Sequence, residues 1–389
     1  MECNPFHEGH RYIIEKARKA AGEDGRVVVV MSGNFVQRGI PAVRSKEVRA
    51  RQVLEAGADL VLELPVRYAT GAAGYFAEGA VATLAATGIV TDLVFGSECA
   101  DAGSLERCAQ LLFDEPEDYR ELLRGYLSQG LSYPLARARA AAESADAVTL
   151  PESPNDLLGV EYLKALRMLS ADHASTRMLV HAIPRIAAVS ATSLREELQA
   201  SDDGIFADDF SGMLLEKLLM IQYGSCRSAM SDYAGIAPDL ANRIGNLLPQ
   251  YTSWTQFCSL LKTRNITRTA AGRALTHILL DVTDDLMPEG AVSEDITYTR
   301  VLGCRRDALA LIGMIRDHGL RLVTSRSDAR RFLPDGSRAQ RQMQQDLHAS
   351  EIWEHLAAVK AARAYQKTAG APLPVPAVPE FSKPLLIVE

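Results

Sequence analysis

The chain has 389 residues, of which 47% are hydrophobic and 23% are charged, so disorder is excluded as the default and there is apolar material for a large core. Its length predicts two or three domains. Lys and Arg total 42 against 49 for Asp and Glu, a net charge of −7. This excludes a simple polybasic nucleic-acid binder and leaves a nucleic-acid partner only through a local basic patch.

Short apolar runs alternate with helical patterns in the first half of the chain. The run of β-branched residues at 27–31 is typical of a strand that is buried on both faces. The alternation predicts a parallel sheet with right-handed crossovers. The expected strands are residues 27–31, 60–64, 93–96 and 178–183, and the expected helices are 11–21, 46–56, 75–87 and 155–169, with a mainly helical insertion at 105–145.

The second half shows almost only helical patterns from about Leu194 onward. The expected helices there include residues 213–223, 273–280 and 308–317. Because Ser201-Asp202-Asp203-Gly204 is typical of a linker, we expect one domain over 1–200 and a helical domain over 201–389. The proline-rich residues 372–384 are expected to wrap the surface as extended chain.

The most informative motif is Asn4-Pro5-Phe6-His7-Glu8-Gly9-His10, which leads into the first expected helix. A helix N-terminus offers free amide donors and a positive field, so it suits a phosphate group. His7 and His10 lie one helical turn apart and can donate to the same phosphoryl oxygens as charge develops on them. The alternative is that both histidines only cap the helix.

A second polar element, Ser190-Ala191-Thr192-Ser193-Leu194-Arg195, follows the last expected strand and opens a helix. Its hydroxyl groups either bind phosphate oxygens or cap the helix. Arg195 can add a charge-assisted contact to the phosphates. Because ligands bind where loops meet at the carboxyl ends of parallel strands, we expect this element to lie beside the histidine motif.

Three further positions follow strands or open helices. Residues 31–39 are polar and predict a site-forming loop, and Lys46 after it reaches a phosphate or a carboxylate, or is a solvated helix lysine. Gly96 ends a strand, where it would let adenine or ribose pack on the backbone. Asn155 either caps the helix that it opens or contacts the nucleotide.

One run in the second half is basic: Lys262, Arg264, Arg268 and Arg273 occur with no acidic residue before Asp281. Threonine and asparagine residues separate them. Such a run either follows an RNA backbone or forms a solvated face.

The six cysteines are widely spaced and form no CxxC pair, so the spacing of a zinc site is absent and we expect reduced thiols. No stretch of roughly 20 residues is apolar enough to span a bilayer. No apolar signal segment opens the chain. We therefore expect a cytoplasmic protein without a membrane partner.

Together these motifs resemble those of the HIGH-type nucleotidyltransferase superfamily and, more closely, the tRNA(Met) cytidine acetate ligase family. The likeness covers nearly the whole chain and is far more specific than HxGH alone. The segments that carry it occur in one order: NPFHEGH, MSGNFVQRG, the Lys46 helix, ELP at 63–65, FGSE, SPNDLLGVEYLKAL, SATSLR, KTRNITRTAAGRALTHILL and YTRVLG.

The resemblance implies a Rossmann-like ATP-binding catalytic domain followed by an all-α tRNA-binding domain. It implies a ligase that activates acetate with ATP as acetyl-adenylate and releases pyrophosphate. That ligase then acetylates N4 of the wobble cytidine (C34) of elongator tRNA(Met), and Mg²⁺ is expected with the nucleotide. By motif position, Asn4 to His10, Gly96, Asn155 and Arg185 would bind ATP.

The same resemblance assigns catalytic roles. His7 and His10 would stabilise the phosphoryl transition state, and Lys46, Ser193 and Arg195 complete the expected catalytic set. The basic run from Lys262 to Arg273 would help to hold tRNA. No covalent nucleophile and no protein-bound metal is required.

Two departures from the family are visible in the sequence. Relatives begin with a strand that leads into the NPF turn, whereas this chain starts at Met1-Glu2-Cys3, so we expect that strand to be missing from the sheet. The loop between Arg185 and Ser190 is also shorter than the glycine- and tyrosine-containing segment of relatives.

Two alternative functions stay open. One is a small-molecule adenylyltransferase of the same superfamily that makes a dinucleotide-type cofactor, which the large second half disfavours. The other is a non-catalytic RNA-binding protein that keeps the sheet as a scaffold, to which the missing strand gives weight.

Overall fold

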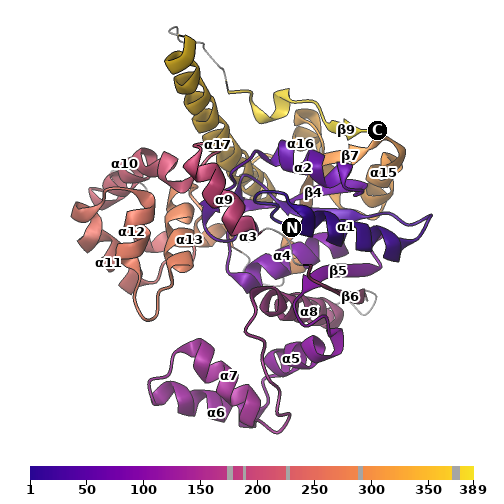
Figure 1. The fold of residues 1–389 in the computed structure, drawn as a ribbon, viewed down its shortest axis with the longest axis vertical. Helices are drawn as coiled ribbons and strands as arrows, with labels where there is room; N and C mark the ends of the chain where they lie inside the picture. Colours follow the sequence, from indigo (N-terminus) through magenta and orange to yellow (C-terminus); the bar gives the residue numbers. More distant parts are fainter. Residues whose placement is uncertain (173–177, 187–189, 225–227, 288–291, 370–376) are drawn as a thin grey trace.

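The protein is a mixed α/β molecule built on a mainly parallel sheet, as Figure 1 shows for a computed structural model of the chain. The structure describes residues 1–172, 178–186, 190–224, 228–287, 292–369 and 377–389. The predicted α/β class is therefore confirmed. The strands are β1 (Val28–Ser32), β2 (Phe35–Val36), β3 (Ile40–Pro41), β4 (Leu60–Leu64), β5 (Asp92–Ser97), β6 (Leu179–Pro184), β7 (Tyr298–Arg305), β8 (Arg321–Val323) and β9 (Leu386–Val388).

Helices surround these strands. The α-helices are α1 (Glu8–Ala21), α2 (Lys46–Glu55), α3 (Val66–Ala69), α4 (Ala73–Ala86), α5 (Ala102–Asp114), α6 (Glu117–Ser128), α7 (Tyr133–Glu143), α8 (Pro154–Asp172), α9 (Ala191–Ala200), α10 (Ser211–Gln222), α11 (Pro238–Leu247), α12 (Trp254–Leu261), α13 (Arg268–Leu279), α14 (Val292–Asp295), α15 (Ala310–Asp317), α16 (Arg326–Phe332) and α17 (Arg338–Ala369). Two short 3₁₀ helices also matter here, η1 (Ala207–Phe210) and η6 (Glu380–Ser382).

The larger sheet has the order β1-β4-β7-β8, and β9 also pairs with β7. β1 and β4 are parallel, β4 and β7 are antiparallel, and β5 and β6 form a separate parallel pair. Alternate residues of β1 face opposite sides of the sheet: Val29 packs in a cluster with Val53 of α2, and Val30 packs in a cluster with Phe76 of α4. This double burial explains the continuous apolar run in the sequence.

The first residues of the chain lie along β1, which ends the order of the larger sheet. The amino group of Met1 donates to the carbonyl of Val30 at 2.5 Å, and the amide of Ser32 donates to the carbonyl of Met1 at 3.0 Å. Cys3 is fully buried beside them. Residues 1–3 thus place the histidine motif next to the carboxyl end of β1.

The second half of the chain contributes strands as well as helices. The expectation of almost only helices after Leu194 is wrong for β7, β8 and β9, because β7 enters the larger sheet between β4 and β8. Residues 201–389 therefore do not form an all-α unit. The tail differs from the expected extended chain at η6, which lies within residues 372–384, and residues 372–376 lie outside the described part.

A cluster of helices, α10 to α13, forms its own core beside the sheet (Figure 1). Phe210, Trp254 and Phe257 are almost fully buried in it. The same core includes Phe35 of β2 and Trp353 of α17. The helical cluster therefore packs directly against β2 and α17. The helices α6 and α7 project at the end of the molecule opposite α17 (Figure 1).

Candidate active site

The histidine motif forms the N-terminus of α1. His7 is the N-cap residue, and its Nδ1 accepts the amide N–H of Gly9 at 3.0 Å. His10 reciprocates, because its Nδ1 accepts the amide N–H of His7 at 3.2 Å. The two ring centroids lie 3.9 Å apart, and Phe6 stacks on the His10 ring. The capping role expected as the alternative is therefore present, and it fixes both rings.

The capping contacts also decide which ring nitrogens carry protons. A neutral imidazole that accepts at Nδ1 must hold its proton on Nε2. Both Nδ1 atoms accept backbone N–H groups, so both Nε2–H groups remain donors. Capping and anion binding are thus compatible: one nitrogen of each ring orders the helix, and the other is left to donate to a ligand.

The electrostatics keep both rings neutral and surround them with positive charge. Burial, the neighbouring His7 and Arg185 lower the pKa of His10 to about 3. Burial, Arg185 and Arg195 lower the pKa of His7. The amide groups at the start of α1 add their own positive field. The mouth of α1 therefore favours an anionic ligand.

Arg195 connects α9 to the histidine motif. Its guanidinium donates to the backbone carbonyl of Asn4 at 2.6 Å and to the hydroxyl of Thr192 at 3.0 Å. Within the described residues no carboxylate forms an ion pair with Arg195, and burial lowers its pKa. The side chain of Asn4 is itself occupied, because its Oδ1 accepts the amide of Val43 at 2.9 Å. Asn4 thus shapes the turn, while Arg195 remains a cation that an anion can pair with.

The start of α9 supplies further donors at the same place. Ser190 caps the helix by accepting the amide of Ser193 at 3.0 Å, as the capping alternative predicts. Thr192 and Ser193 lie in the first turn, and the hydroxyl of Thr192 accepts from Arg195. Residues 187–189 of the short preceding loop lie outside the described part of the chain.

Glu98, just beyond β5, joins two of the expected nucleotide-binding residues. Its Oε1 accepts from Asn155 Nδ2 at 2.6 Å and from Arg185 Nη1 at 3.0 Å. Asn155 therefore does not cap α8 but reaches across to the loop after β5. Gly96 lies behind them, since a Cβ on it would meet Ile13 of α1 at 3.2 Å and Arg185 Cγ at 3.7 Å. Its missing side chain lets α1 and Arg185 approach the strand.

Sequence reasoning missed Asp156, which orders the loop after β5. This buried carboxylate accepts from the amide of Glu98 at 2.9 Å, the amide of Cys99 at 3.1 Å and the hydroxyl of Ser153 at 2.6 Å, and it also accepts from the hydroxyl of Ser97. These hydrogen bonds hold the pKa of Asp156 low against the effect of burial. The local signal was Ser153 three residues before it, because a Ser and an acidic residue at this spacing are typical of a helix start.

Lys46 lies apart from the histidine motif. Its side chain is fully buried, and Nζ contacts Glu63 at 2.9 Å and Glu380 at 2.8 Å. The carboxylate contact expected for it is therefore found, whereas contact with a phosphate is not, because both carboxylates already occupy the ammonium group. Glu8 also points away from the site: it is exposed and pairs with Arg11 at 3.5 Å.

Residues 31–39 do not form an open loop: residues 31 and 32 end β1, and residues 35–41 form a hairpin of β2 and β3. Gly39 closes its turn with φ +65°, and its amide donates to the carbonyl of Val36 at 2.9 Å. A Cβ on Gly39 would lie 2.1 Å from the backbone nitrogen of Arg273. The glycine thus permits the hairpin to dock on α13, which a larger residue would prevent.

The basic run extends from the end of α12 into α13. Lys262, Arg264 and Arg268 are exposed, and Arg273 is half-buried, with its pKa lowered by burial. Arg264 donates to the carbonyl of Gly130 in the turn between α6 and α7 at 2.6 Å. The run is therefore a surface that continues from the helical cluster toward α6 and α7, and it does not contact the histidines.

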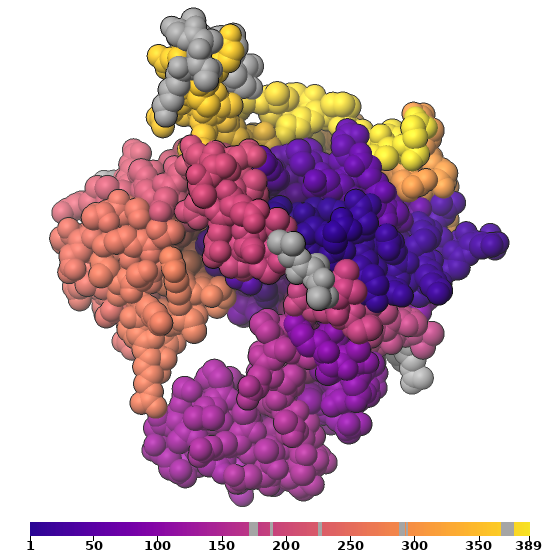
Figure 2. Space-filling model, in the orientation of Figure 1, coloured from indigo at the N-terminus to yellow at the C-terminus, as the bar shows by residue number. Residues whose placement is uncertain are grey.

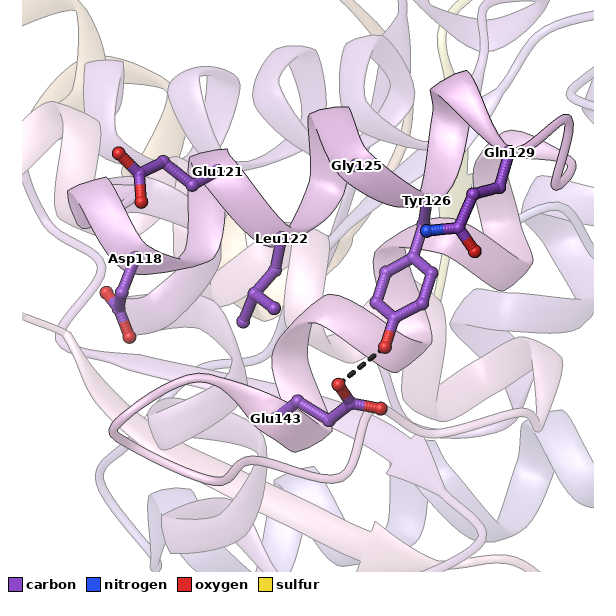
Figure 3. Close-up of a pocket in the computed structure, with 7 residues that line it drawn as sticks. All are labelled: Asp118, Glu121, Leu122, Gly125, Tyr126, Gln129 and Glu143. Carbon is purple, nitrogen blue, oxygen red and sulfur yellow. Dashed lines mark hydrogen bonds between the residues drawn. The ribbon is translucent and has the colours of Figure 1, made fainter.

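A cavity of about 500 Å³ lies on α6 and α7 (Figure 3). Three carboxylates line it, and Tyr126 donates to Glu143 at 2.5 Å, so it does not suit a polyphosphate. None of its lining residues belongs to the histidine site. The lining residues are Asp118, Glu121, Leu122, Gly125, Tyr126, Gln129 and Glu143.

Three other features concern the described residues only. No group of three or more His, Cys, Asp or Glu side chains among them is placed to hold a metal ion. None of the described helices combines the length and the apolar composition that crossing a membrane requires. The described cysteines are all free, and Cys226 lies outside the described part.

Known proteins match this arrangement over most of the chain. The family described as HIGH Nucleotidyl Transferase matches residues 1–205 and 188–368. The tRNA(Met) cytidine acetate ligase of Acetivibrio thermocellus is 34% identical, over 81% of this chain and 84% of its own length. That of Syntrophotalea carbinolica is 35% identical, over 81% of each chain.

Solved structures agree with the sequence matches. Thermotoga maritima TmcAL bound with alpha-thio ATP has a TM-score of 0.79 at 28% identity, covering 91% of this chain and 93% of that one. The apo form has a TM-score of 0.81 at 29% identity, with the same coverage. Since the family match spans both halves and the relatives exceed 30% identity over four-fifths of the chain, this protein belongs to the tRNA(Met) cytidine acetate ligase family of HIGH nucleotidyl transferases.

Proposed function

We propose that the protein activates acetate with ATP and transfers the acetyl group to N4 of the wobble cytidine (C34) of elongator tRNA(Met). The observation that carries the proposal is the pair of Nε2–H donors, on rings 3.9 Å apart, at the N-terminus of α1. The names of the relatives and the ATP analogue bound to Thermotoga maritima TmcAL support it.

In the first step a carboxylate oxygen of acetate attacks the α-phosphorus of ATP, and pyrophosphate leaves. Negative charge develops on the phosphoryl oxygens, where His7, His10 and Arg195 would each donate. Ser193 would add a hydroxyl from α9. Because acetate is a poor acyl donor until it carries a good leaving group, the task of the protein here is positioning and charge stabilisation.

The nucleoside part of ATP would lie over the carboxyl ends of β5 and β6. Gly96 lies behind Arg185 there. Arg185 and Asn155, which Glu98 joins, would border the nucleoside. Asn4, Pro5, Phe6, Glu8 and Gly9 would contribute as the turn and first helical residues that hold the two rings. Asp156 is a positioning residue, because it fixes the loop that carries Glu98.

In the second step the amino nitrogen N4 of cytidine attacks the acetyl carbon, and AMP leaves. The tRNA would be held by the basic run of Lys262, Arg264, Arg268 and Arg273, whose charges can contact phosphates. Mg²⁺ would be held by the phosphates of ATP and neutralise part of their charge. We place the reaction in the cytoplasm, where acetate, ATP and tRNA(Met) meet.

The test is mass spectrometry of elongator tRNA(Met) after incubation with the protein, ATP and isotopically labelled acetate. We expect labelled N4-acetylcytidine at the wobble position and one AMP for each acetyl group. Pyrophosphate release that depends on a small nucleotide instead of acetate would favour a cofactor adenylyltransferase. Binding of tRNA without any ATP-dependent product would favour a non-catalytic RNA-binding protein.

A further inference from the structure

A second cavity is lined by Arg195 but by neither His7 nor His10. It has a volume of about 310 Å³ and is bounded by α9, the β2–β3 hairpin, η1 and the helices α12 and α13. Figure 2 shows the segment that contains α9 on the surface between the N-terminal residues and the helical cluster. Because Arg195 both lines this cavity and donates to Asn4 of the histidine motif, the two sites adjoin.

The lining of the cavity combines apolar walls with three arginines and two carboxylates, Glu196 and Asp208, of which Asp208 accepts from Thr255. Phe206 and Trp254 form part of the apolar surface. Arg38, Arg195 and Arg268 also line it, and within the described residues none of the three forms an ion pair with a carboxylate. Apolar and aromatic surface beside unpaired cations suits a nucleotide, whose base is flat and whose phosphate is anionic.

The buried indole of Trp254 has only a weak partner. Its side chain is 1% exposed. The indole N–H donates to the sulfur of Cys258, which also lines the cavity, and sulfur is a weak acceptor. A buried donor without a good acceptor is unusual in folded proteins.

We propose that this cavity receives the acceptor nucleotide of the RNA, with its base turned out of the anticodon loop. The proposal rests on the proposed function and names the place of its second substrate. A base that reacts must leave its stack to reach an active site, and the flipped base is read by stacking and hydrogen bonds. The size of the cavity lies in the range of small-ligand sites.

The position of Arg268 explains how RNA would reach the cavity. Arg268 belongs both to the basic run and to the cavity wall. An RNA backbone that follows the run from Lys262 would therefore pass the cavity, and Arg195, which lines the cavity and donates to Asn4, connects it to the histidine motif. There the amino nitrogen of the base forms a bond to the acetyl carbon, the bond from that carbon to the AMP oxygen breaks, and the amino group gives one proton to solvent.

The first test fills the cavity. Thr269 lines it from the exposed first turn of α13, so Thr269→Phe adds bulk inside without disturbing a buried core. We expect acetyl transfer to tRNA(Met) to fall at least about 100-fold, while acetate-dependent exchange between ATP and pyrophosphate keeps at least half of its rate. Thr252→Phe, an exposed position outside the cavity, is the matched control. Normal transfer by a folded Thr269→Phe variant would overturn the proposal.

The second test locates the base and needs no turnover. An anticodon stem-loop RNA with 5-iodocytidine at the wobble position is crosslinked to the full chain, and the crosslinked peptide is mapped by mass spectrometry. We expect the crosslink at residues 205–208 or 254–258. A crosslink to peptides elsewhere would contradict the cavity as the site of the acceptor base, even if exchange between ATP and pyrophosphate is normal. A crosslink in the cavity, in a protein that shows no acetate-dependent exchange between ATP and pyrophosphate, would support the cavity as the RNA site but contradict the proposed function.

Discussion

Two polar clusters of this protein contrast in how they use their charges. At the mouth of α1, His7 and His10 spend one nitrogen each on capping and keep the other free, and Arg195 lacks a carboxylate partner among the described residues. Around Lys46, two cations and two carboxylates are almost completely buried against one another: Lys46, Arg300, Glu63 and Glu380.

The buried cluster joins parts of the chain that are far apart in sequence. Burial alone would lower the pKa of Lys46, but Glu63 and Glu380 raise it above its ordinary value. The four groups lie on α2, β4, β7 and η6, so they hold the sheet and the tail together. The contrast teaches that polar residues of the motifs divide into two kinds: those whose charges are paired inside the protein, and those that leave donors for a ligand.

The largest expected effect is at the mouth of α1. We expect His10→Ala to lower acetate-dependent exchange between ATP and pyrophosphate by about 100- to 1000-fold, because one donor to the developing charge is lost. Affinity for tRNA should change less than about twofold. The matched control is His355→Ala, on the exposed face of α17. If the His10 variant exchanged ATP and pyrophosphate at the native rate, the ring of His10 would have only a capping role.

A change in the buried cluster should affect the stability of the protein and leave ATP binding nearly unchanged. We expect Lys46→Met to lower the free energy of unfolding by about 3 kcal/mol or more, because Glu63 and Glu380 are left buried with Arg300 as their one remaining cation in the cluster. ATP affinity of the folded fraction should change less than twofold. Denaturant unfolding and ATP titration measure the two quantities. Adding Glu63→Gln should recover part of the stability, and a loss of ATP binding without loss of stability would place Lys46 in the site.

The sequence predicted the sheet core well because periodicity and burial act locally. β4 was expected at its observed bounds, and the helix after Lys46 within one residue of them. β7 was missed because Arg300 and Gly303 interrupt its β-branched and aromatic residues, and both fit only in the folded state: Arg300 pairs with Glu63, and a Cβ on Gly303 would meet Leu54 at 2.8 Å. Such long-range reasons are invisible to a local pattern.

The site could be predicted in part for the same reason. The histidine motif and the Ser190–Arg195 element were expected to meet, and the contact between Arg195 and Asn4 brings them together. The fate of Lys46 could not be predicted, because Glu380 lies more than 300 positions away in the chain and only the fold brings it near. Local sequence identified the donors, whereas tertiary packing decides which of them are free.

A smaller effect is expected at the basic run, where Arg268 is solvent-exposed and Arg273 is half-buried. Replacing Arg268 and Arg273 by glutamine should weaken tRNA binding and reduce the slope of log affinity against log salt by about 2. The control is Arg330→Gln with Arg331→Gln, two exposed arginines on α16. Binding is measured by filter retention at several salt concentrations. An unchanged slope would show that the basic run is a solvated face that does not contact the tRNA.

The smallest effect concerns pH and stability. Burial lowers the pKa of His10 to about 3, whereas an unfolded histidine titrates near 6.5. Below pH 6.5 the unfolded chain takes up a proton that the folded chain does not, so stability is lost as pH falls. Between pH 7.5 and 5.5 we expect His10→Asn to lose about 1 kcal/mol less than the native protein, by denaturant unfolding. An equal loss in both would mean that the ring is not kept neutral.

The most direct measurement is a crystal structure of the chain with a non-hydrolysable ATP analogue. We predict phosphate oxygens within hydrogen-bonding distance of Nε2 of both His7 and His10, with Arg195 on the same phosphate group and the Nδ1 atoms still bound to the backbone amides. A nucleotide bound elsewhere, or phosphates that contact neither ring, would contradict the claim that capping leaves these two donors for the ligand.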